Sequence, residues 1–395
     1  MGEWKEIVLD KVAIINPTES LIKGTKAKKI AMTILQPFTK KVPSYSMEEC
    51  NGGMKFRNGD TLVARITPCL ENGKTVLVDI LDDEEIGFGS TEYIVLREKQ
   101  NVSDKRFLYY FAISPEFRDV AILSMTGSSG RQRVQTDVVR NHLFSLPPLP
   151  EQKAIASVLS SLDDKTDLLH RQNKTLEAMA ETLFRQWFVE EAQEGWVENS
   201  LLEVIQLIGG GTPKTAIAEY WDGDIPWLAG GDIASNHKSF INCSVKSITE
   251  VGLNNSSAKL LPKYATVISA RGTVGKYCLL AQSMAFSQSN YGILPNPKIS
   301  ECFFFTYLLM NHVVEELQSS AYGCVFDTIT TTTFKEIKVI LPTETEILRF
   351  EQSLSPYFKK MFLNKSKIHT LEKLRDTLLP KLMSGEVRVQ FKKEA

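Results

Sequence analysis

LPPLPEQKAIASVLSSLDDKTDLLHRQNKTLEAMAETLFRQWF, from Leu146 to Phe188, is the stretch that decides the fold of this chain. After its prolines it reads as one amphipathic helix of about forty residues, whereas globular helices average about 11–12 residues. Two mostly apolar rows recur at heptad spacing, at Ile155, Leu162, Leu169, Leu176 and Leu183 and at Leu159, Thr166, Asn173, Ala180 and Trp187. This spacing predicts one side of a coiled coil.

A second stretch near the end of the chain carries a matching seam. Its two rows are Phe350, Tyr357, Asn364, Leu371 and Leu378, and Leu354, Met361, Ile368, Arg375 and Leu382. Pairing the helices antiparallel with their centres aligned sets Asn173 opposite Asn364, where two buried amides would fix the register, and sets Leu162 against Arg375 as an imperfect layer. The alternatives are that each helix packs only on its own globular domain, or that both amides point to solvent.

Composition places the chain among ordinary globular proteins. Hydrophobic residues make up 43% of it and charged residues 24%, which excludes a disordered chain. No run approaches about 18 consecutive apolar residues, and MGEWKEIVLD lacks the regions of a signal peptide, so we expect a cytoplasmic protein without membrane contact. The cysteines include no CxxC pair and the histidines no HxxxH spacing, which predicts neither a metal site nor a disulfide.

The chain also repeats itself. Six pairs of segments recur in the same order: Trp4–Val12 with Trp196–Val204, Ala64-Arg65 and Gly73-Lys74 with Ala270-Arg271 and Gly275-Lys276, Phe88–Tyr93 with Phe286–Tyr291, Phe107–Tyr110 with Phe304–Tyr307, Leu146–Pro148 with Ile340–Pro342, and Leu176-Glu177 with Leu371-Glu372. Each match is weak alone, but their common order predicts an internal duplication.

Each repeat therefore consists of a globular part and a long helix. The globular parts combine short β-rich runs, at 61–64, 93–96 and 266–268, with one amphipathic helix each, around Lys105–Leu123 and Glu301–Ser319. The fold class that follows is α+β: two globular α+β domains separated by two long antiparallel coiled-coil helices, related by a pseudo-two-fold internal repeat. We expect domains at 1–150 and 192–345, long helices at 151–191 and 346–385, and a tail at 386–395.

Charge is distributed unevenly behind a formal net charge of −1. Ser20–Met47 contains lysines at 23, 26, 28, 29, 40 and 41 and no acidic residue, and Val251–Ser300 contains Lys259, Lys263, Arg271, Lys276 and Lys298 and no acidic residue. These basic islands lie in the globular domains and favour binding to nucleic acid, although solvated loops that merely lack acids are the alternative.

Three motifs carry a family resemblance. Leu146-Pro-Pro-Leu-Pro-Glu-Gln152 leads into the long helix, Gly209–Pro213 precedes Tyr220-Trp221 and Ile225-Pro226-Trp227, and Leu378–Glu386 reads LLPKLMSGE. With the duplication, they make the whole chain resemble the DNA specificity subunit of type I restriction-modification enzymes.

The resemblance implies both a role and a set of partners. In that family two target recognition domains each read one half of a split double-stranded DNA site, and the helices dock two methyltransferase subunits. Adenine methylation from S-adenosylmethionine belongs to those partners, so no cofactor is expected on this chain, and whether an ATP-dependent restriction subunit also binds stays open. The chain itself would be non-catalytic.

The residues agree with a non-catalytic role. Gly211-Thr-Pro-Lys-Thr215 has proline where a phosphate-binding loop needs glycine, and Asn16-Pro-Thr-Glu19 lacks the second proline and the aromatic residue of an adenine-methyltransferase motif. A different class of function, a duplicated coiled-coil adaptor that assembles proteins without reading DNA, remains the alternative.

Candidate DNA contacts are the polar and basic residues of the globular domains, because Arg, Lys, Asn and Gln read base edges and Lys, Arg, Ser and Thr bind phosphates. In the first domain they are Arg65, Lys74, Ser90, Thr91, Arg131, Gln132 and Arg133, the last three following a glycine-rich loop at 126–130. In the second they are Thr212, Lys214, Lys263, Arg271, Thr273, Lys276, Gln288, Ser289 and Asn290. Arg65 and Arg271 could instead simply end strands, and Trp221 and Trp227 are interpreted as core residues.

Overall fold

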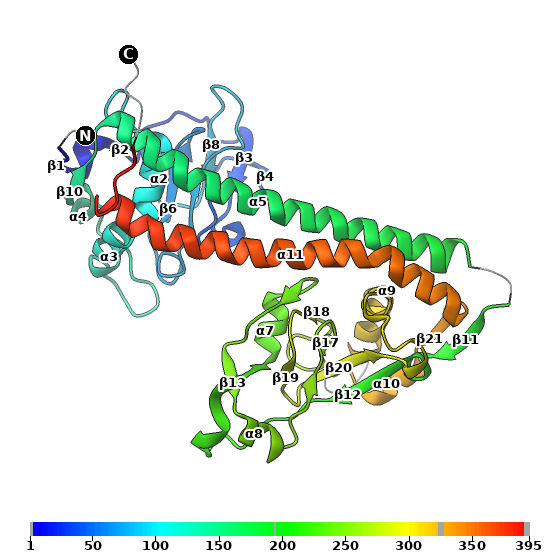
Figure 1. Cartoon of the computed structure of the whole chain (residues 1–395). Helices are drawn as coiled ribbons and strands as arrows, with labels where there is room; N and C mark the ends of the chain where they lie inside the picture. Colours follow the sequence, from blue (N-terminus) through cyan, green and yellow to red (C-terminus); the bar gives the residue numbers. More distant parts are fainter. Residues whose placement is uncertain (1–2, 193–194, 323–327, 391–395) are drawn as a thin grey trace. The chain divides into compact units, whose positions relative to one another are not determined.

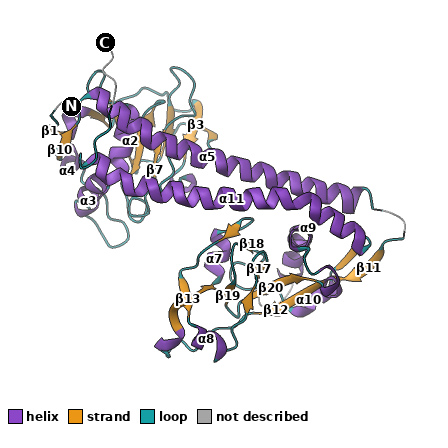
Figure 2. Cartoon of the chain, in the orientation of Figure 1, coloured by secondary structure: helices purple, strands orange, loops and turns teal. Residues whose placement is uncertain are grey.

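The computed structural model describes residues 3–192, 195–322 and 328–390 (Figure 1). The chain forms two compact units: unit 1 contains Met1–Asp167 and His369–Ala395, and unit 2 contains Leu168–Ile368. Each unit holds one globular α+β domain and a segment of each of the two long helices, which stand out in Figure 2.

The two long helices lie close to their predicted bounds. The first, α5, spans Leu149–Arg185 and continues as the π-helical turn η2 at Gln186–Glu190, and the second, α11, spans Glu344–Met383. Pro150 lies in the first turn of α5, where a missing N–H leaves no hydrogen bond unmade. The helix α11 continues through Pro356 and Pro380.

The globular part of unit 1 is built on two four-stranded sheets, β2-β9-β6-β7 and β4-β3-β8-β5, with a separate β1-β10 pair. Its elements in chain order are β1 (Lys5–Val8), α1 (Leu9–Val12), β2 (Ala13–Ile15), β3 (Lys26–Ile30), η1 (Met32–Ile34), β4 (Ser46–Glu49), β5 (Lys55–Phe56), β6 (Thr61–Ala64), β7 (Thr75–Leu77), β8 (Gly87–Gly89), β9 (Tyr93–Glu98), α2 (Lys105–Ile113), α3 (Pro115–Leu123), α4 (Thr136–Arg140) and β10 (Leu143–Leu146).

Unit 2 repeats this plan with the sheets β12-β20-β17-β18-β14 and β15-β13-β19-β16 and the pair β11-β21. Its elements are β11 (Val197–Ser200), α6 (Leu201–Val204), β12 (Ile205–Gly209), η3 (Ala218–Tyr220), β13 (Trp221–Leu228), α7 (Gly230–Ser235), β14 (Phe240–Ile241), β15 (Lys246–Ile248), α8 (Glu250–Asn254), β16 (Leu260–Leu261), β17 (Thr266–Ser269), β18 (Tyr277–Leu280), β19 (Met284–Phe286), β20 (Asn290–Pro295), η4 (Pro297–Ile299), α9 (Phe303–Tyr322), α10 (Thr331–Glu336) and β21 (Lys338–Leu341).

The helix predicted at Lys105–Leu123 is broken in the structure, and that prediction is wrong. Ser114 accepts a hydrogen bond from the N–H of Phe117 and Pro115 occupies the first position of α3, so a new helix begins there. Proline removes the hydrogen bond that would have continued α2. The corresponding helix in unit 2, α9, is continuous.

The hydrogen bonds of the central strands shift two of the predicted repeat matches by one residue. The N–H of Arg65 donates to the carbonyl of Glu92 at 2.9 Å, and in unit 2 the N–H of Ala270 donates to the carbonyl of Ser289 at 2.9 Å. Arg65 therefore corresponds to Ala270, and Arg271 lies one residue further along. Glu92 likewise corresponds to Ser289, and not to Asn290 as the match of Phe88–Tyr93 with Phe286–Tyr291 predicts. A shift of one residue matters because successive side chains on a strand point to opposite faces.

The antiparallel seam is present within each unit. In unit 2, Nδ2 of Asn364 donates to Oδ1 of Asn173 at 2.8 Å, which is the pairing that the heptad alignment predicts, and the rings of Trp187 and Phe350 are 5.2 Å apart. In unit 1, Ile155 and Leu382 are buried in the same apolar core.

The layer predicted to pair Leu162 with Arg375 is instead a buried ion pair. Nη1 of Arg375 lies 3.0 Å from Oδ1 of Asp163, and the hydroxyl of Tyr110 donates to Oδ2 of that carboxylate at 2.6 Å. Arg375 also donates to the carbonyl of Phe38 at 3.2 Å. The arginine thus joins both long helices to the globular domain of unit 1.

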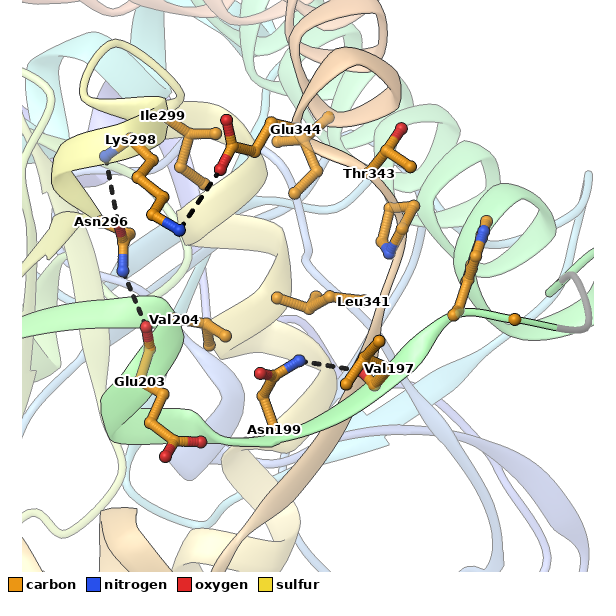
Figure 3. A pocket seen from close by; sticks show the side chains of 14 residues that line it. Val197, Asn199, Glu203, Val204, Asn296, Lys298, Ile299, Leu341, Thr343 and Glu344 are labelled. Carbon is orange, nitrogen blue, oxygen red and sulfur yellow. Dashed lines mark hydrogen bonds and ion pairs between the residues drawn. The ribbon is translucent and has the colours of Figure 1, made fainter.

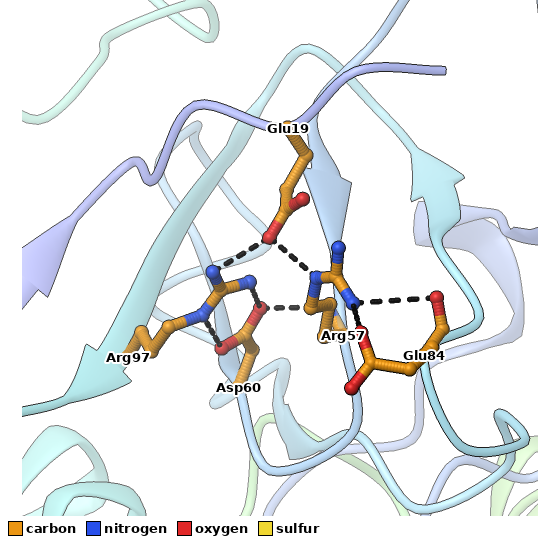
Figure 4. Close-up of polar contacts among 5 residues, drawn as sticks. All are labelled: Glu19, Arg57, Asp60, Glu84 and Arg97. Carbon is orange, nitrogen blue, oxygen red and sulfur yellow. Dashed lines mark hydrogen bonds and ion pairs between the residues drawn. The ribbon is translucent and has the colours of Figure 1, made fainter. Parts of the chain in front are cut away.

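Two further arginines, Arg97 and Arg388, hold unit 1 together. Figure 4 shows Arg97 donating to both oxygens of Asp60 at 2.7 Å and to Glu19 at 2.6 Å. In the tail, Arg388 donates to Glu151 at 2.7 Å and lies over the ring of Trp4. The first part of the predicted tail is therefore packed on unit 1, and residues 391–395 lie outside the described residues.

Candidate nucleic-acid interface

Three charged side chains of unit 1 meet where β6 ends and β9 begins. Arg133 donates from Nε and Nη2 to Oε1 of Glu92 at 3.0 and 2.8 Å, and Nε of Arg65 lies 3.9 Å from Oε2 of the same carboxylate. The side chain of Arg133 is 44% exposed and that of Arg65 is 29% exposed. The cluster carries more positive than negative charge and reaches solvent.

Backbone hydrogen bonds bring the glycine-rich loop to this cluster. The N–H of Thr67 donates to the carbonyl of Gln132 at 3.0 Å, and the N–H of Val134 donates to the carbonyl of Arg65 at 2.8 Å. Gly127 and Gly130 have φ angles of 130° and 75°, which L-amino acids with side chains rarely adopt, so glycine permits the turn. Arg131 is exposed at its tip.

The remaining candidates of the first domain divide into two groups. Ser90 and Thr91 immediately precede Glu92, and Oγ of Ser90 accepts a hydrogen bond from the N–H of Glu92 at 3.1 Å. They therefore belong to the cluster. The Nζ of Lys74, in contrast, donates to the carbonyl of Met32 at 3.0 Å, which directs its charge toward the protein.

Glu92 is the residue of this cluster that sequence reasoning missed. The pKa of its carboxyl lies below the ordinary value because Arg133 donates hydrogen bonds to it and because Arg133 and Arg65 are positively charged. The carboxylate therefore stays ionised and continues to accept the hydrogen bonds of Arg133. The search for basic islands could not find it, but its position directly after Ser90 and Thr91 in the repeated Phe88–Tyr93 segment was a usable signal.

In unit 2 the candidates gather where β17 ends and β18 begins. Arg271 and Thr273 are exposed in this turn, and the carbonyl of Lys276 accepts a hydrogen bond from the N–H of Ser269 at 2.7 Å. The adjacent loop carries Gln288 and Ser289, because Ser289 bonds to Ala270. Among the described residues no carboxylate lies within ion-pair distance of Arg271 or Lys276.

Asn290 is not available to DNA, and its assignment as a contact residue is wrong. Only 1% of its surface is exposed. Its Nδ2 donates to Oγ of Ser287 at 2.8 Å, so the side chain holds the loop that precedes β20. Its polarity suggested a base contact, but the strand turns the side chain inward.

Thr212 lies beside the same loop, whereas Lys263 does not. The N–H of Gly211 donates to the carbonyl of Phe286 at 3.0 Å, which brings Thr212 close to the loop that carries Gln288. Lys263 precedes β17, at the opposite end of that strand from Arg271, and its Nζ lies 4.0 Å from the ring centroid of Phe362 on α11. Unit 2 therefore brings most of its candidates together but leaves Lys263 on the helix side.

The two tryptophans position this segment. Nε1 of Trp227 donates to the carbonyl of Gly211 at 2.9 Å, and only 6% of Trp227 is exposed, which confirms it as a core residue. Nε1 of Trp221 donates to the carbonyl of Lys214 at 3.3 Å. Lys214 itself is exposed beyond this contact.

The first basic island is largely neutralised by carboxylates from elsewhere in unit 1. Lys28 lies 2.8 Å from Glu85 and Lys29 lies 2.7 Å from Glu48, while Lys40 and Lys41 pair with Asp164 and Asp167 of α5 at 2.7 and 2.9 Å. A stretch without acids in sequence is therefore not a free cationic surface here.

Unit 2 also contains a cavity of about 480 Å³ between β11, η4 and the start of α11 (Figure 3). Trp196, Ile299 and Ile347 give it apolar walls, and Lys298 lies 3.7 Å from Glu344 at its rim. None of the DNA candidates lines it. The cavity is thus separate from the interface.

Within residues 3–192, 195–322 and 328–390, no group of three His, Cys, Asp or Glu side chains could hold a metal ion. None of the helices in that part of the chain is long and apolar enough to cross a membrane. Cys324 lies outside the described residues.

Comparisons with known proteins agree with this arrangement. The family model described as "Type I restriction modification DNA specificity domain" matches residues 1–178 and 193–373. The HindI specificity subunit of Haemophilus influenzae is 24% identical over 84% of this chain and 87% of its own length, and the MjaVIII specificity subunit of Methanocaldococcus jannaschii is 24% identical over 93% and 91%.

The fold has a solved counterpart as well. The crystal structure of a type I restriction-modification system S subunit from M. genitalium superposes with a TM-score of 0.59 at 17% identity and covers 98% of this chain and 97% of that one. The family match covers both repeats, as the duplication predicts. The chain therefore belongs to the type I restriction-modification DNA specificity family, and it is a non-catalytic subunit that recognises DNA sequence.

Proposed function

We propose that each unit of this chain reads one half of a bipartite double-stranded DNA site, and that the long helices dock two methyltransferase subunits. The observation that carries the first part is the pair of basic loop clusters at the end of β6 and at the end of β17. Strands β6 and β17 occupy corresponding positions in the two repeats, because β6 pairs antiparallel with β9 and β17 pairs antiparallel with β20. Two corresponding surfaces suit two half-sites.

The clusters differ in chemistry, which supports two different half-site sequences. Arg65, Glu92 and Arg133 form the first, whereas Ala270 and Ser289 occupy the positions of Arg65 and Glu92 in the second. Arginine and lysine donate to O6 and N7 of guanine, whereas glutamine pairs with N6 and N7 of adenine in the major groove. Exposed Arg271 and Gln288 are the base-reading candidates of unit 2.

An apolar groove on the helices supports the docking of a protein partner. In unit 2 a groove of about 580 Å³ is lined by Ala178, Met179, Leu183 and Tyr357, and Met179 is 45% exposed. Exposed apolar grooves of this kind are typical of protein–protein contacts.

The repeat places a similar row of side chains in unit 1, with Lys373 at the position of Ala178. Matching Leu176 with Leu371 makes Leu374, Leu378 and Leu162 the counterparts of Met179, Leu183 and Tyr357, and Leu374 is 44% exposed. These two corresponding rows of partly exposed apolar side chains are the reason for proposing two copies of one partner. S-adenosylmethionine would then bind to those methyltransferase subunits, and an ATP-dependent restriction subunit would join through them or beside them.

The coiled-coil adaptor explains the helices but not the exposed basic loops. An adaptor has no use for two cations, Arg271 and Lys276, that have no carboxylate partner among the described residues and lie near Gln288 at the end of a strand. DNA recognition uses all three, because phosphates and base edges accept hydrogen bonds from such side chains. The family match favours the same choice.

The experiment is selection of bound sequences from a random duplex library with the full chain and its methyltransferase subunits. The wild type is expected to select a split sequence. Exchange of Trp196–Pro342 for the corresponding segment of a relative should change one half of that sequence only. Selection of no sequence would favour the adaptor, and a simultaneous change in both halves would contradict one reader per unit.

A further inference from the structure

Glu92 is an acidic residue in a surface that we propose to face a polyanion. A carboxylate repels phosphates, so an acid between Arg65 and Arg133 weakens DNA binding unless it also has a favourable effect on the interface. Its hydrogen bonds from Nε and Nη2 of Arg133, at 3.0 and 2.8 Å, fix the plane of that guanidinium. A long arginine side chain would otherwise sample many rotamers.

These hydrogen bonds occupy only one edge of the guanidinium. Arginine has five N–H donors in a rigid planar fork, and Glu92 uses the edge formed by Nε and Nη2. Nη1 makes one longer contact, at 3.3 Å, with the carbonyl of Arg131. The end formed by Nη1 and Nη2 therefore keeps N–H groups to donate, and a fork of two N–H groups is what binds O6 and N7 of guanine.

We infer that Glu92 is a positioning residue that holds Arg133 ready to read a guanine in the first half of the DNA site. The inference rests on the proposed function. Arg65 contributes from the other side, since its positive charge lies 3.9 Å from the carboxylate and limits the cost of an acid near phosphates. Nε of Arg65 is buried and has no hydrogen-bond partner among the described residues.

Unit 2 provides an internal control, because it does not contain this pair. The hydrogen bonds to the strand end place Ser289 at the position of Glu92 and Ala270 at the position of Arg65. A change at Glu92 should therefore act on one half-site and leave the other half as a reference in the same molecule. A general loss of folding would affect both halves.

The test compares Glu92→Ala, Glu92→Gln and Arg133→Lys with the wild type, using the full chain in its native complex and selection from a random duplex library. The matched control is Glu48→Ala. It removes another carboxylate of unit 1 that forms an ion pair, with Nζ of Lys29 at 2.7 Å. Discrimination at one guanine of the first half-site should fall about 5- to 150-fold in Glu92→Ala and Arg133→Lys. Glu92→Gln retains one acceptor oxygen, so its discrimination at that guanine should be intermediate between that of Glu92→Ala and that of the wild type. Glu48→Ala should select the wild-type sequence.

A second readout addresses the base directly. Replacing the selected guanine with 7-deazaguanine removes the N7 acceptor, which should weaken wild-type binding but have little effect on Arg133→Lys. The inference is overturned if Glu92→Ala keeps the wild-type base preference, if Arg133→Lys keeps it, or if both half-sites change. Failure of the wild type to select any sequence would instead overturn the proposed function.

Discussion

Nδ2 of Asn364 donates a hydrogen bond to Oδ1 of Asn173 at 2.8 Å, and it also donates to Oε1 of Gln172 at 2.9 Å. Asn364 is fully buried, and its own Oδ1 has no partner among the described residues. The pair thus satisfies some but not all of the hydrogen-bonding groups that it buries. Such an asparagine layer specifies register at a cost in stability.

The first prediction concerns this layer. Asn173→Leu should lower the free energy of unfolding by about 1–3 kcal/mol, because the buried amide of Asn364 loses one of its two acceptors. Asn173→Leu combined with Asn364→Leu should recover most of that loss, because no amide is then left unpaired. Urea denaturation of the single and double variants measures the coupling, and additive losses would contradict the pairing.

The second prediction concerns the buried ion pair of unit 1. Asp163→Ala should lower the free energy of unfolding by about 3 kcal/mol, because the buried charge of Arg375 then keeps only the largely exposed Asp376 as an ion-pair partner. The side chains of Arg375 and Asp163 are only 11% and 9% exposed. The control is Glu190→Ala, which breaks an exposed pair with Arg185 whose side chains are 58% and 63% exposed, and should cost less than about 1 kcal/mol. Equal losses in the two variants would show that burial does not set the energy of the Arg375 pair.

The third prediction concerns pH and two buried glutamates of unit 2. Burial raises the pKa of Glu177 and of Glu351 from 4.5 to about 7, although Tyr307 donates a hydrogen bond to Glu177 and the N–H groups of Phe304 and Phe305 donate to Glu351. Between these two pH values the folded chain binds protons that the unfolded chain has lost. The free energy of unfolding should therefore fall as pH rises through this window and level off above it.

Replacing the carboxyls with amides tests this sign. Glu177→Gln and Glu351→Gln should each raise the free energy of unfolding at pH 8 by about 1–3 kcal/mol and flatten its dependence between pH 5 and 7. Glu190→Gln, at an exposed position, serves as the control. Thermal or urea unfolding across the pH range measures this dependence. Glutamine variants that kept the wild-type slope of the free energy of unfolding against pH would contradict the prediction.

The fourth prediction separates the basic residues of unit 2 by their place on β17. Each phosphate contact contributes about 0.9 to the slope of log K against log salt concentration. Lys276→Ala should weaken binding to all sequences and reduce that slope by about 1, whereas Lys263→Ala should leave it unchanged, because Lys263 packs on Phe362. Arg271→Ala should instead relax specificity at one base pair of the second half-site. Binding measured at several salt concentrations distinguishes these outcomes. A reduced slope in Lys263→Ala would show that Lys263 contacts a phosphate after all.

The sequence by itself determined the architecture: the duplication, the two long helices and the Asn173–Asn364 register. These features follow from local periodicity and from composition, since a heptad seam extends over many turns and each turn adds to the same signal. The break at Pro115 shows the limit of periodicity, because one residue without an N–H overrode an otherwise continuous helical pattern.

Only the tertiary structure decided which side chains meet at the interface. Glu92 and Arg133 are 41 residues apart, and Asp163 and Arg375 are 212 apart, so neither pair has a signal in local sequence. The same holds for the one-residue shift that matches Arg65 with Ala270, and for the inward direction of Asn290, because strand pairing sets which face each side chain occupies. Sequence periodicity specifies which elements form, whereas long-range strand register and burial decide which charges remain free to contact DNA.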